Sequence, residues 1–157
     1  MSELVFSSSN RLANLLLVED NEADIFLTQE AFRNAGITNH LSIALDGEEA
    51  LSMLRREGRY GDQPQPDLVL LDLNLPCLDG REVLMKMRAD PNLKTIPVVV
   101  MSHSPSDIDF LKRGNLQADG YTTKPVDLDR LREIIATIGC FGLAVVMRHT
   151  RPACGGP

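Results

Sequence analysis

Five polar residues stand at the ends of short apolar runs, and their types suit metal and anion chemistry. Glu19 and Asp20 follow "NLLLV", and Asp72 ends "DLVLLD". Ser102 ends "IPVVVMS", and Lys124 follows "GYTT". A carboxylate at the end of a buried run is costly unless it reaches water or has a cationic partner. We therefore expect these side chains to meet each other or a cation.

The charges of this set indicate a cation and a phosphoryl group. Two carboxylates about 4 Å apart repel by about 4 kcal/mol at an effective dielectric of about 20, so three together need a cation. Carboxylates without His or Cys are hard oxygen ligands, which favour Mg²⁺ or Mn²⁺ over zinc. Lys124 would add a second, fixed positive charge, and Ser102 could donate a hydrogen bond. A dianionic phosphoryl group held between lysine and metal fits this arrangement.

Five apolar runs that predict strands alternate with segments of helical period. The strands are expected within residues 14–20, 40–46, 67–73, 96–102 and 120–125. The first helix is predicted from Asn21, as its cap, to Ala35, before Gly36. Later helices are expected near residues 47, 79, 106 and 127, and the one from residue 79 must end before Pro91.

The alternation of strands and helices predicts where the five polar residues lie in the fold. Strands that are apolar almost throughout predict a parallel sheet covered on both faces, and right-handed crossovers make it a doubly wound α/β domain. In such a sheet the carboxyl ends of the strands lie along one edge, and ligands bind where the strand order reverses. All five polar residues are therefore predicted at that edge.

The composition narrows the range of possible binding partners. A chain of 157 residues fits one domain, and its net charge of −6, without a block of Lys or Arg, argues against a nucleic-acid or anionic-membrane partner. The start "MSELVFSSSN" does not resemble a signal peptide, and no apolar run could span a bilayer. Cys77, Cys140 and Cys154 lack metal-site spacing and suit a reducing compartment. We expect a cytoplasmic protein whose partner is a protein or a small molecule.

The order of the five polar residues, with "DLNLPCLDG" after the third strand, resembles the receiver domain of two-component response regulators over residues 14–138. The resemblance implies a flavodoxin-like fold with a five-stranded parallel sheet. It implies that Asp72 takes a phosphoryl group from a kinase phosphohistidine, with Lys124 and Ser102 assisting. Asp20 and Asp72, the backbone carbonyl of Asn74 and, partly through water, Glu19 would hold Mg²⁺, with Mn²⁺ as an alternative.

The same resemblance implies a conformational switch. Ser102 would be drawn to the phosphoryl group, and Tyr121 would rotate inward, which would alter the surface formed by the fourth helix, fifth strand and fifth helix. The Lys124–Pro125 bond is expected to be cis. Such a protein is a phosphoacceptor in signalling that catalyses its own phosphorylation and slow dephosphorylation, rather than an enzyme with a separate substrate.

Within the family, "RREGRYGDQPQPDLVLLDLNLP" and "ADGYTTKPVDLDRLREII" resemble the small regulators paired with cyanobacterial and bacterial phytochromes. This likeness rests on the Pro-rich loop before the third strand and on the long C-terminus. It implies a light-sensing histidine kinase as the partner.

The C-terminus after the domain is expected to mediate a homodimer. Residues 1–13 are an N-terminal segment, 139–148 a dimerisation extension and 149–157 a disordered tail. An apolar stripe at helical spacing continues past the domain, and related regulators use an extended last helix to dimerise. The predicted contacts are Phe141, Leu143, Val145 and Val146. The alternative is a helix end that folds back on its own domain, since Gly139 and Gly142 weaken a helix.

Other functions fit the sequence less well. A haloacid dehalogenase-type phosphatase needs a second Asp two residues after the nucleophile, where Asn74 stands. A flavodoxin-like FMN carrier needs a phosphate loop after the first strand, where "EDNEAD" would repel phosphate. A receiver-like interaction module that works without phosphorylation stays open as the alternative function.

Two residues near the predicted site depart from the family pattern or add reactivity. His103 stands where the family usually has a smaller residue, so we expect it to narrow access to the phosphoryl group or to stack against it. Cys77 lies in the loop after Asp72, where its oxidation could disturb the site, although an ordinary loop thiol is the simpler interpretation.

Overall fold

Five parallel strands form the central sheet of the protein. A computed structural model describes residues 2–6, 11–34, 39–137 and 143–147. The sheet has the order β4 (Leu41–Ala44), β3 (Leu15–Val18), β5 (Leu68–Asp72), β6 (Val98–Ser102) and β7 (Gly120–Thr123), and every neighbouring pair is parallel. The chain leaves β3 toward β4 and then returns to β5 on the other side. The strand order therefore reverses between β3 and β5, as the doubly wound prediction requires.

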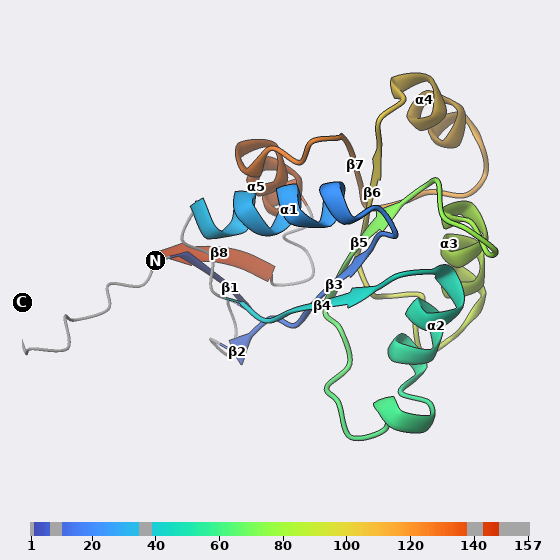
Figure 1. Cartoon of the computed structure of the whole chain (residues 1–157), viewed down its shortest axis with the longest axis horizontal. Coiled ribbons are helices and arrows are strands. Elements are labelled where there is room, and N and C mark those ends of the chain that lie inside the picture. The colour runs from blue at the N-terminus through green and yellow to red at the C-terminus, as the bar shows by residue number, and fades with distance from the viewer. Residues whose placement is uncertain (1, 7–10, 35–38, 138–142, 148–157) are drawn as a thin grey trace, which may run out of the picture.

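Helices cover both faces of this sheet. They are α1 (Glu22–Asn34), α2 (Gly47–Arg55), α3 (Gly80–Ala89), α4 (Pro105–Arg113) and α5 (Leu128–Thr137), with a short 3₁₀ helix, Gly58–Tyr60, after α2. Figure 1 shows α1 and α5 on one side of the sheet and α2 and α3 on the other. The five-stranded flavodoxin-like fold predicted from the sequence is confirmed.

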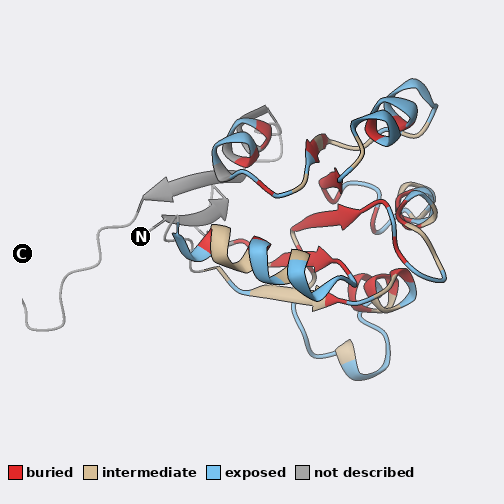
Figure 2. Cartoon of the chain, turned by 45° about the horizontal axis from the view of Figure 1, so that its top comes forward, coloured by how far each residue is buried: buried red, intermediate tan, exposed pale blue. Residues whose placement is uncertain are grey.

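Two apolar cores separated by the sheet hold these layers together. Successive strand residues point to opposite faces. Leu16 and Val18 of β3 therefore join the core under α2 and α3, while Leu15 and Leu17 join the core under α1 and α5. Figure 2 shows the inner strands β3, β5 and β6 buried, the edge strand β4 mostly half-buried, and the outer helix faces exposed. Burial on both faces explains why these three inner strands are apolar almost throughout.

Polar residues fix where the helices begin. The side chain of Asn21 accepts a hydrogen bond from the Asp24 amide at 3.0 Å, which confirms Asn21 as a cap. Asp79 accepts from the Glu82 amide at 3.0 Å and caps α3, which ends before Pro91 as predicted. Asp46 and Ser104 cap α2 and α4 in the same way. The Lys124–Pro125 peptide bond is cis, also as expected.

A second, smaller sheet was not predicted. It has the order β2 (Arg11–Leu12), β1 (Ser2–Phe6) and β8 (Leu143–Met147), with antiparallel pairing. The prediction that the apolar stripe continues the last helix is wrong for Leu143–Met147, which pairs with β1 as a strand. The predicted contact residues Leu143, Val145 and Val146 lie in β8, whereas Phe141 and the predicted disordered tail lie outside the described residues.

Among the residues that the structure describes, no helix is both long enough and apolar enough to cross a bilayer.

Candidate functional site

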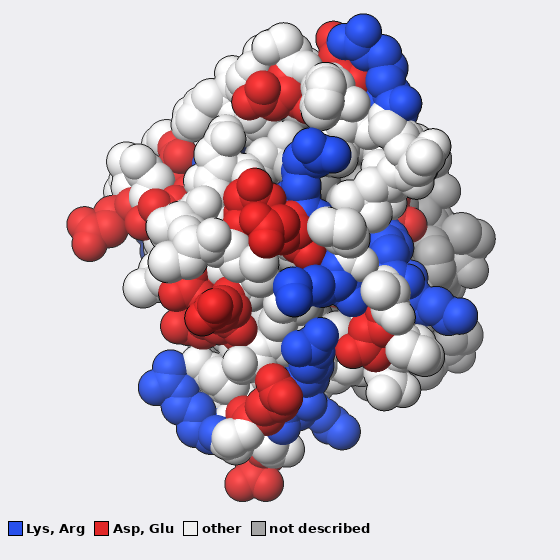
Figure 3. All heavy atoms as spheres, turned by 90° about the vertical axis from the view of Figure 1, so that its right-hand side faces the viewer, with Lys and Arg blue, Asp and Glu red and all other residues white. Residues whose placement is uncertain are grey.

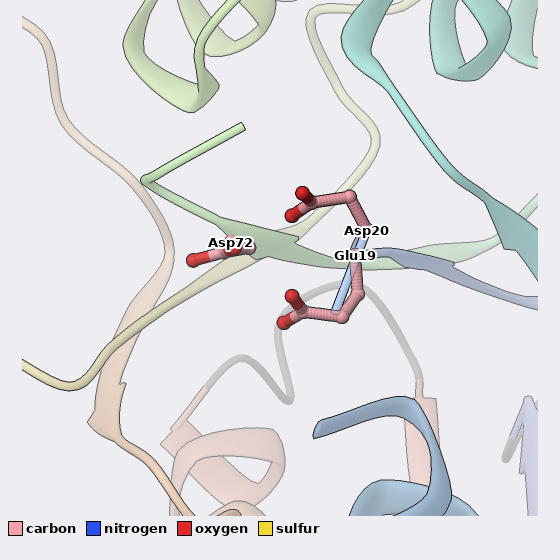
Figure 4. Close-up of side chains that lie close together, drawn as sticks. All are labelled: Glu19, Asp20 and Asp72. Carbon is pink, nitrogen blue, oxygen red and sulfur yellow. The ribbon is translucent and has the colours of Figure 1, made fainter. Parts of the chain in front are cut away.

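Three carboxylates meet where the ends of β3 and β5 adjoin. Glu19 and Asp20 directly follow β3, and Asp72 is the last residue of β5. One carboxylate oxygen from each lies within 4.8 Å of the others, and Figure 4 shows the three side chains projecting from these neighbouring strand ends. Glu19 and Asp72 are only 1% and 3% exposed, whereas Asp20 faces solvent. The acidic set predicted from the sequence thus lies at the reversal of the strand order.

Lys124 supplies the positive charge within this cluster. Its ammonium, from a side chain only 5% exposed, pairs with the carboxylate of Glu19 and lies 3.2 Å from Asp72 Oδ1. It also lies 3.1 Å from Asp24 Oδ2 in the first turn of α1. The lysine reaches the cluster because it directly follows β7, at the same edge of the sheet. One cation therefore faces several carboxylates in a buried place.

The protonation equilibria reflect this crowding. Burial raises the pKa of Glu19 above its ordinary value, and the nearby charge of Asp72 adds to this, although the hydrogen bond from Lys124 opposes it. Burial would lower the pKa of Lys124, but its hydrogen bond to Glu19 and the charge of Asp72 outweigh burial and raise it. Lys124 is therefore held charged.

The donor set fits a hard divalent cation. Glu19, Asp20 and Asp72 offer carboxylate oxygens within 4.8 Å of each other, and such ligands suit Mg²⁺ or Mn²⁺. Asn74, whose carbonyl was predicted as a further ligand, lies two residues after Asp72 and donates its backbone N–H to Asp72 Oδ1 at 3.2 Å. This hydrogen bond holds the backbone at Asn74 next to the Asp72 carboxylate. Figure 3 views the molecule from this side and shows acidic side chains near the centre with Lys and Arg beside them.

A glycine lets the loop after β5 fold back against the end of that strand. A Cβ on Gly80, the first residue of α3, would lie 2.3 Å from the carbonyl oxygen of Asp72 and 2.7 Å from Leu73 Cα. Both are backbone atoms, which cannot move aside as a flexible side chain could. The start of α3 therefore packs directly against the backbone that carries Asp72.

The hydroxyl groups of Ser102 and Tyr121 form hydrogen bonds with residues of adjacent loops. Ser102 is fully buried at the end of β6, and its hydroxyl accepts a hydrogen bond from the Ser104 amide at 3.0 Å. The Tyr121 hydroxyl accepts from the Ala118 amide at 3.0 Å and donates to Gln117 Oε1 at 3.3 Å. Tyr121 is half-buried and packs against the core under α2 and α3. Their switch roles stay predictions.

Asp24 is a residue of the site that was not predicted from the sequence. Its carboxylate binds Lys124 and also lies 3.0 Å from His103 Nε2. Burial would raise the pKa of Asp24, but the hydrogen bonds with His103 and Lys124 outweigh burial and lower it. The cap at Asn21 was the available signal, since it places Asp24 in the first helical turn, beside the end of β3.

Comparison with known proteins identifies the family. The family model described as the response regulator receiver domain matches residues 15–136. The chain is 41% identical over 138 residues to the response regulator Rcp1 of Synechocystis, covering 88% of this chain and 94% of Rcp1. The solved Mn²⁺-bound form of Rcp1 matches with a TM-score of 0.65 and 38% identity, covering 90% of this chain and 99% of that one.

Two further solved structures are similar. The bacteriophytochrome response regulator AtBRR matches with a TM-score of 0.79 and 34% identity, covering 90% of this chain and 99% of that one. The phosphorylated cyanobacterial phytochrome response regulator RcpA matches with a TM-score of 0.66 and 45% identity, covering 83% and 93% of the two chains. With its parallel sheet and its acidic cluster beside a buried lysine, this chain belongs to the response regulator receiver domain family.

Proposed function

We propose that the chain is a single-domain response regulator that accepts a phosphoryl group on Asp72 from a sensor histidine kinase. One observation carries the proposal. Asp72 Oδ1 lies 3.2 Å from the ammonium of Lys124, and Asp72 shares a cluster of oxygens within 4.8 Å with Glu19 and Asp20. The acceptor carboxylate thus has a fixed cation on one side and a metal-ligand set on the other.

The chemistry follows from these positions. A carboxylate oxygen of Asp72 forms a bond to phosphorus while the bond from phosphorus to the histidine nitrogen breaks, and the imidazole takes up a proton as it leaves. Lys124 holds a phosphoryl oxygen, and Glu19, Asp20, Asp72 and the Asn74 carbonyl would hold Mg²⁺ or Mn²⁺. When bound, that cation neutralises charge on the transferring group, where electrostatics supplies most of the catalysis. Hydrolysis of the aspartyl phosphate by water returns Asp72 to its carboxylate.

A small phosphodonor tests the acceptor directly. The purified chain is incubated with acetyl phosphate and Mg²⁺, and intact masses are compared for wild type and Asp72→Asn. We expect one phosphoryl adduct that requires Mg²⁺ and is absent from the variant. If wild type gains no adduct from acetyl phosphate or from a histidine kinase, the alternative function as an unphosphorylated interaction module is favoured.

The output surface is proposed beside Tyr121. A hollow of about 400 Å³ lies between α4 and the start of α5, and its wall includes Tyr121, Lys112 and Arg130. Lys112 Nζ stands 5.1 Å from the Tyr121 ring. Movement of Ser102 toward the phosphoryl group would free Tyr121 to turn inward and change the shape of this hollow. A partner protein that binds there could then distinguish the two states, so the signal would pass through protein contacts.

The kinase is proposed to be a phytochrome. Rcp1 covers most of the chain, and the similar solved structures AtBRR and RcpA are phytochrome or bacteriophytochrome response regulators. Transfer from an autophosphorylated phytochrome kinase is the test, with a histidine kinase that senses another signal as the control. Faster transfer from the phytochrome supports the proposal, and equal or slower transfer contradicts it.

The chain is also proposed to form a homodimer through residues 139–148. Within the described sheet β8 is an edge strand, and an exposed edge can pair with another chain. Deleting residues 139–157 should then convert a dimer to a monomer in sedimentation, whereas deleting only 149–157 should leave the dimer intact. A wild-type chain that sediments as a monomer at all concentrations would rule the dimer out.

A further inference from the structure

A continuous row of polar contacts runs from the acceptor to the surface. Asp72 Oδ1 lies 3.2 Å from Lys124 Nζ, which lies 3.1 Å from Asp24 Oδ2, which lies 3.0 Å from His103 Nε2. The second oxygen of Asp24 is 3.3 Å from the same ring nitrogen. The side chains of Asp72, Lys124, Asp24 and His103 are 4%, 5%, 13% and 62% exposed. His103 thus covers Asp24, and Asp24 covers the lysine.

This row joins three elements around the acceptor. Asp24 belongs to the first turn of α1, and Lys124 directly follows β7. His103 begins the loop between β6 and α4, directly after Ser102. The Ser102 hydroxyl accepts a hydrogen bond from Ser104, so the loop is closed on itself while His103 ties it to α1.

We propose that Asp24 and His103 form a latch that slows phosphorylation of Asp72 until the phosphoryl group displaces Asp24 from Lys124. This proposal rests on the proposed phosphorylation of Asp72. Asp24 engages the lysine that the incoming group needs, and its negative charge opposes a phosphoryl dianion. His103 holds Asp24 in place by contact with both of its oxygens. Asp24 is therefore a positioning residue, which acts through Lys124.

The latch also connects phosphorylation to the loop that bears Ser102. Once phosphoryl oxygens pair with Lys124, Asp24 loses its contact with the lysine. The Asp24–His103 pair is then no longer connected to Lys124 and Asp72. The β6–α4 loop is then released from α1. In the predicted switch Ser102 moves toward the phosphoryl group, and the latch would set the resistance to that movement.

Rates of adduct formation test the latch. The full chain, with saturating Mg²⁺ and acetyl phosphate, is followed by intact mass for Asp24→Asn, His103→Ala and the double variant. We expect each single change to raise the rate by about threefold to tenfold, the range for one partly exposed charge-assisted hydrogen bond. Because both changes open the same latch, the double variant should be no faster than the faster single variant.

Matched variants separate the latch from general effects. Glu22→Gln removes a negative charge at an exposed position in the same first turn of α1, and His40→Ala removes an exposed histidine elsewhere. Both should keep the wild-type rate, and so should His103→Gln, whose amide can still donate to Asp24. Urea unfolding checks that each variant is folded.

Several results would overturn the latch. These are wild-type rates in Asp24→Asn and His103→Ala, a rate for Glu22→Gln equal to that of Asp24→Asn, or single effects that multiply in the double variant. Each of these can be seen only if wild type forms an adduct. Failure of the latch is thereby distinct from failure of Asp72 as the acceptor, in which no protein forms one.

Discussion

Replacing Lys124 by methionine should destabilise the metal-free protein, because several carboxylates lose their cation. The Asp72–Lys124 distance of 3.2 Å corresponds to an attraction of about 5 kcal/mol at an effective dielectric of about 20. At the 4.8 Å limit of the cluster, each pair of its carboxylates repels by about 3.5 kcal/mol on the same scale. Part of the attraction is offset by desolvation of the ammonium, so we expect Lys124→Met to cost about 3–5 kcal/mol.

Urea unfolding with a chelator and again with saturating Mg²⁺ measures this effect. Mg²⁺ supplies the missing positive charge, so the deficit of Lys124→Met should shrink when the metal is present. Lys86→Met, at an exposed lysine of α3, is the control and should lie near wild type in both conditions. A deficit below about 1 kcal/mol would contradict the electrostatic reasoning, since removing one partner of a buried pair costs about 3–5 kcal/mol. A deficit that Mg²⁺ leaves unchanged would contradict it as well.

Three further predictions concern the surroundings of Asp72. Gly80→Ala should lower the free energy of unfolding in urea by about 1–3 kcal/mol and slow adduct formation, because its Cβ would lie 2.3 Å from the Asp72 carbonyl oxygen. Unchanged stability and an unchanged rate would refute this reasoning. Asp24→Asn should be less stable than wild type at neutral pH. A lowered carboxyl pKa adds stability only above that pKa, so the difference in stability should vanish as pH falls through the lowered pKa of Asp24, below its ordinary 3.8. Unfolding across this acidic range measures the difference, and a difference that does not change with pH would contradict the prediction. Ser102→Ala should still accept a phosphoryl group but leave the NMR signals of the Tyr121 ring unmoved on phosphorylation, whereas a wild-type shift in the variant would separate Tyr121 from Ser102.

Local signals were enough to predict the parallel sheet and the convergence of the site. The inner strands β3, β5 and β6 are buried on both faces, so each is a short apolar run that stands out against the periodic helices. Because all five strands are parallel, polar residues at their carboxyl ends had to share one edge. Glu19, Asp72 and Lys124 therefore came together without any knowledge of side-chain geometry.

The small sheet could not be predicted, because its pairing is non-local. In β8, Leu143 pairs with Phe6 and Met147 with Ser2, nearly the whole chain apart. The stretch "LAVVM" is too short for its period to separate strand from helix, and its β-branched valines favour a strand only when a partner is present. Likewise the contact between Asp24 and His103 depends on how α1 sits beside the β6–α4 loop, which no local pattern encodes.

Phosphotransfer from an autophosphorylated sensor histidine kinase is the most direct test of the central claim, that Asp72 is the phosphoacceptor. The kinase is mixed with Mg²⁺ and with wild type, Asp72→Asn or Asp79→Asn, and the intact mass of each regulator is followed. Asp79 lies in the same loop but caps α3, and asparagine can keep that cap. We predict one adduct on wild type and on Asp79→Asn, and none on Asp72→Asn. An adduct of equal yield on Asp72→Asn would contradict the claim.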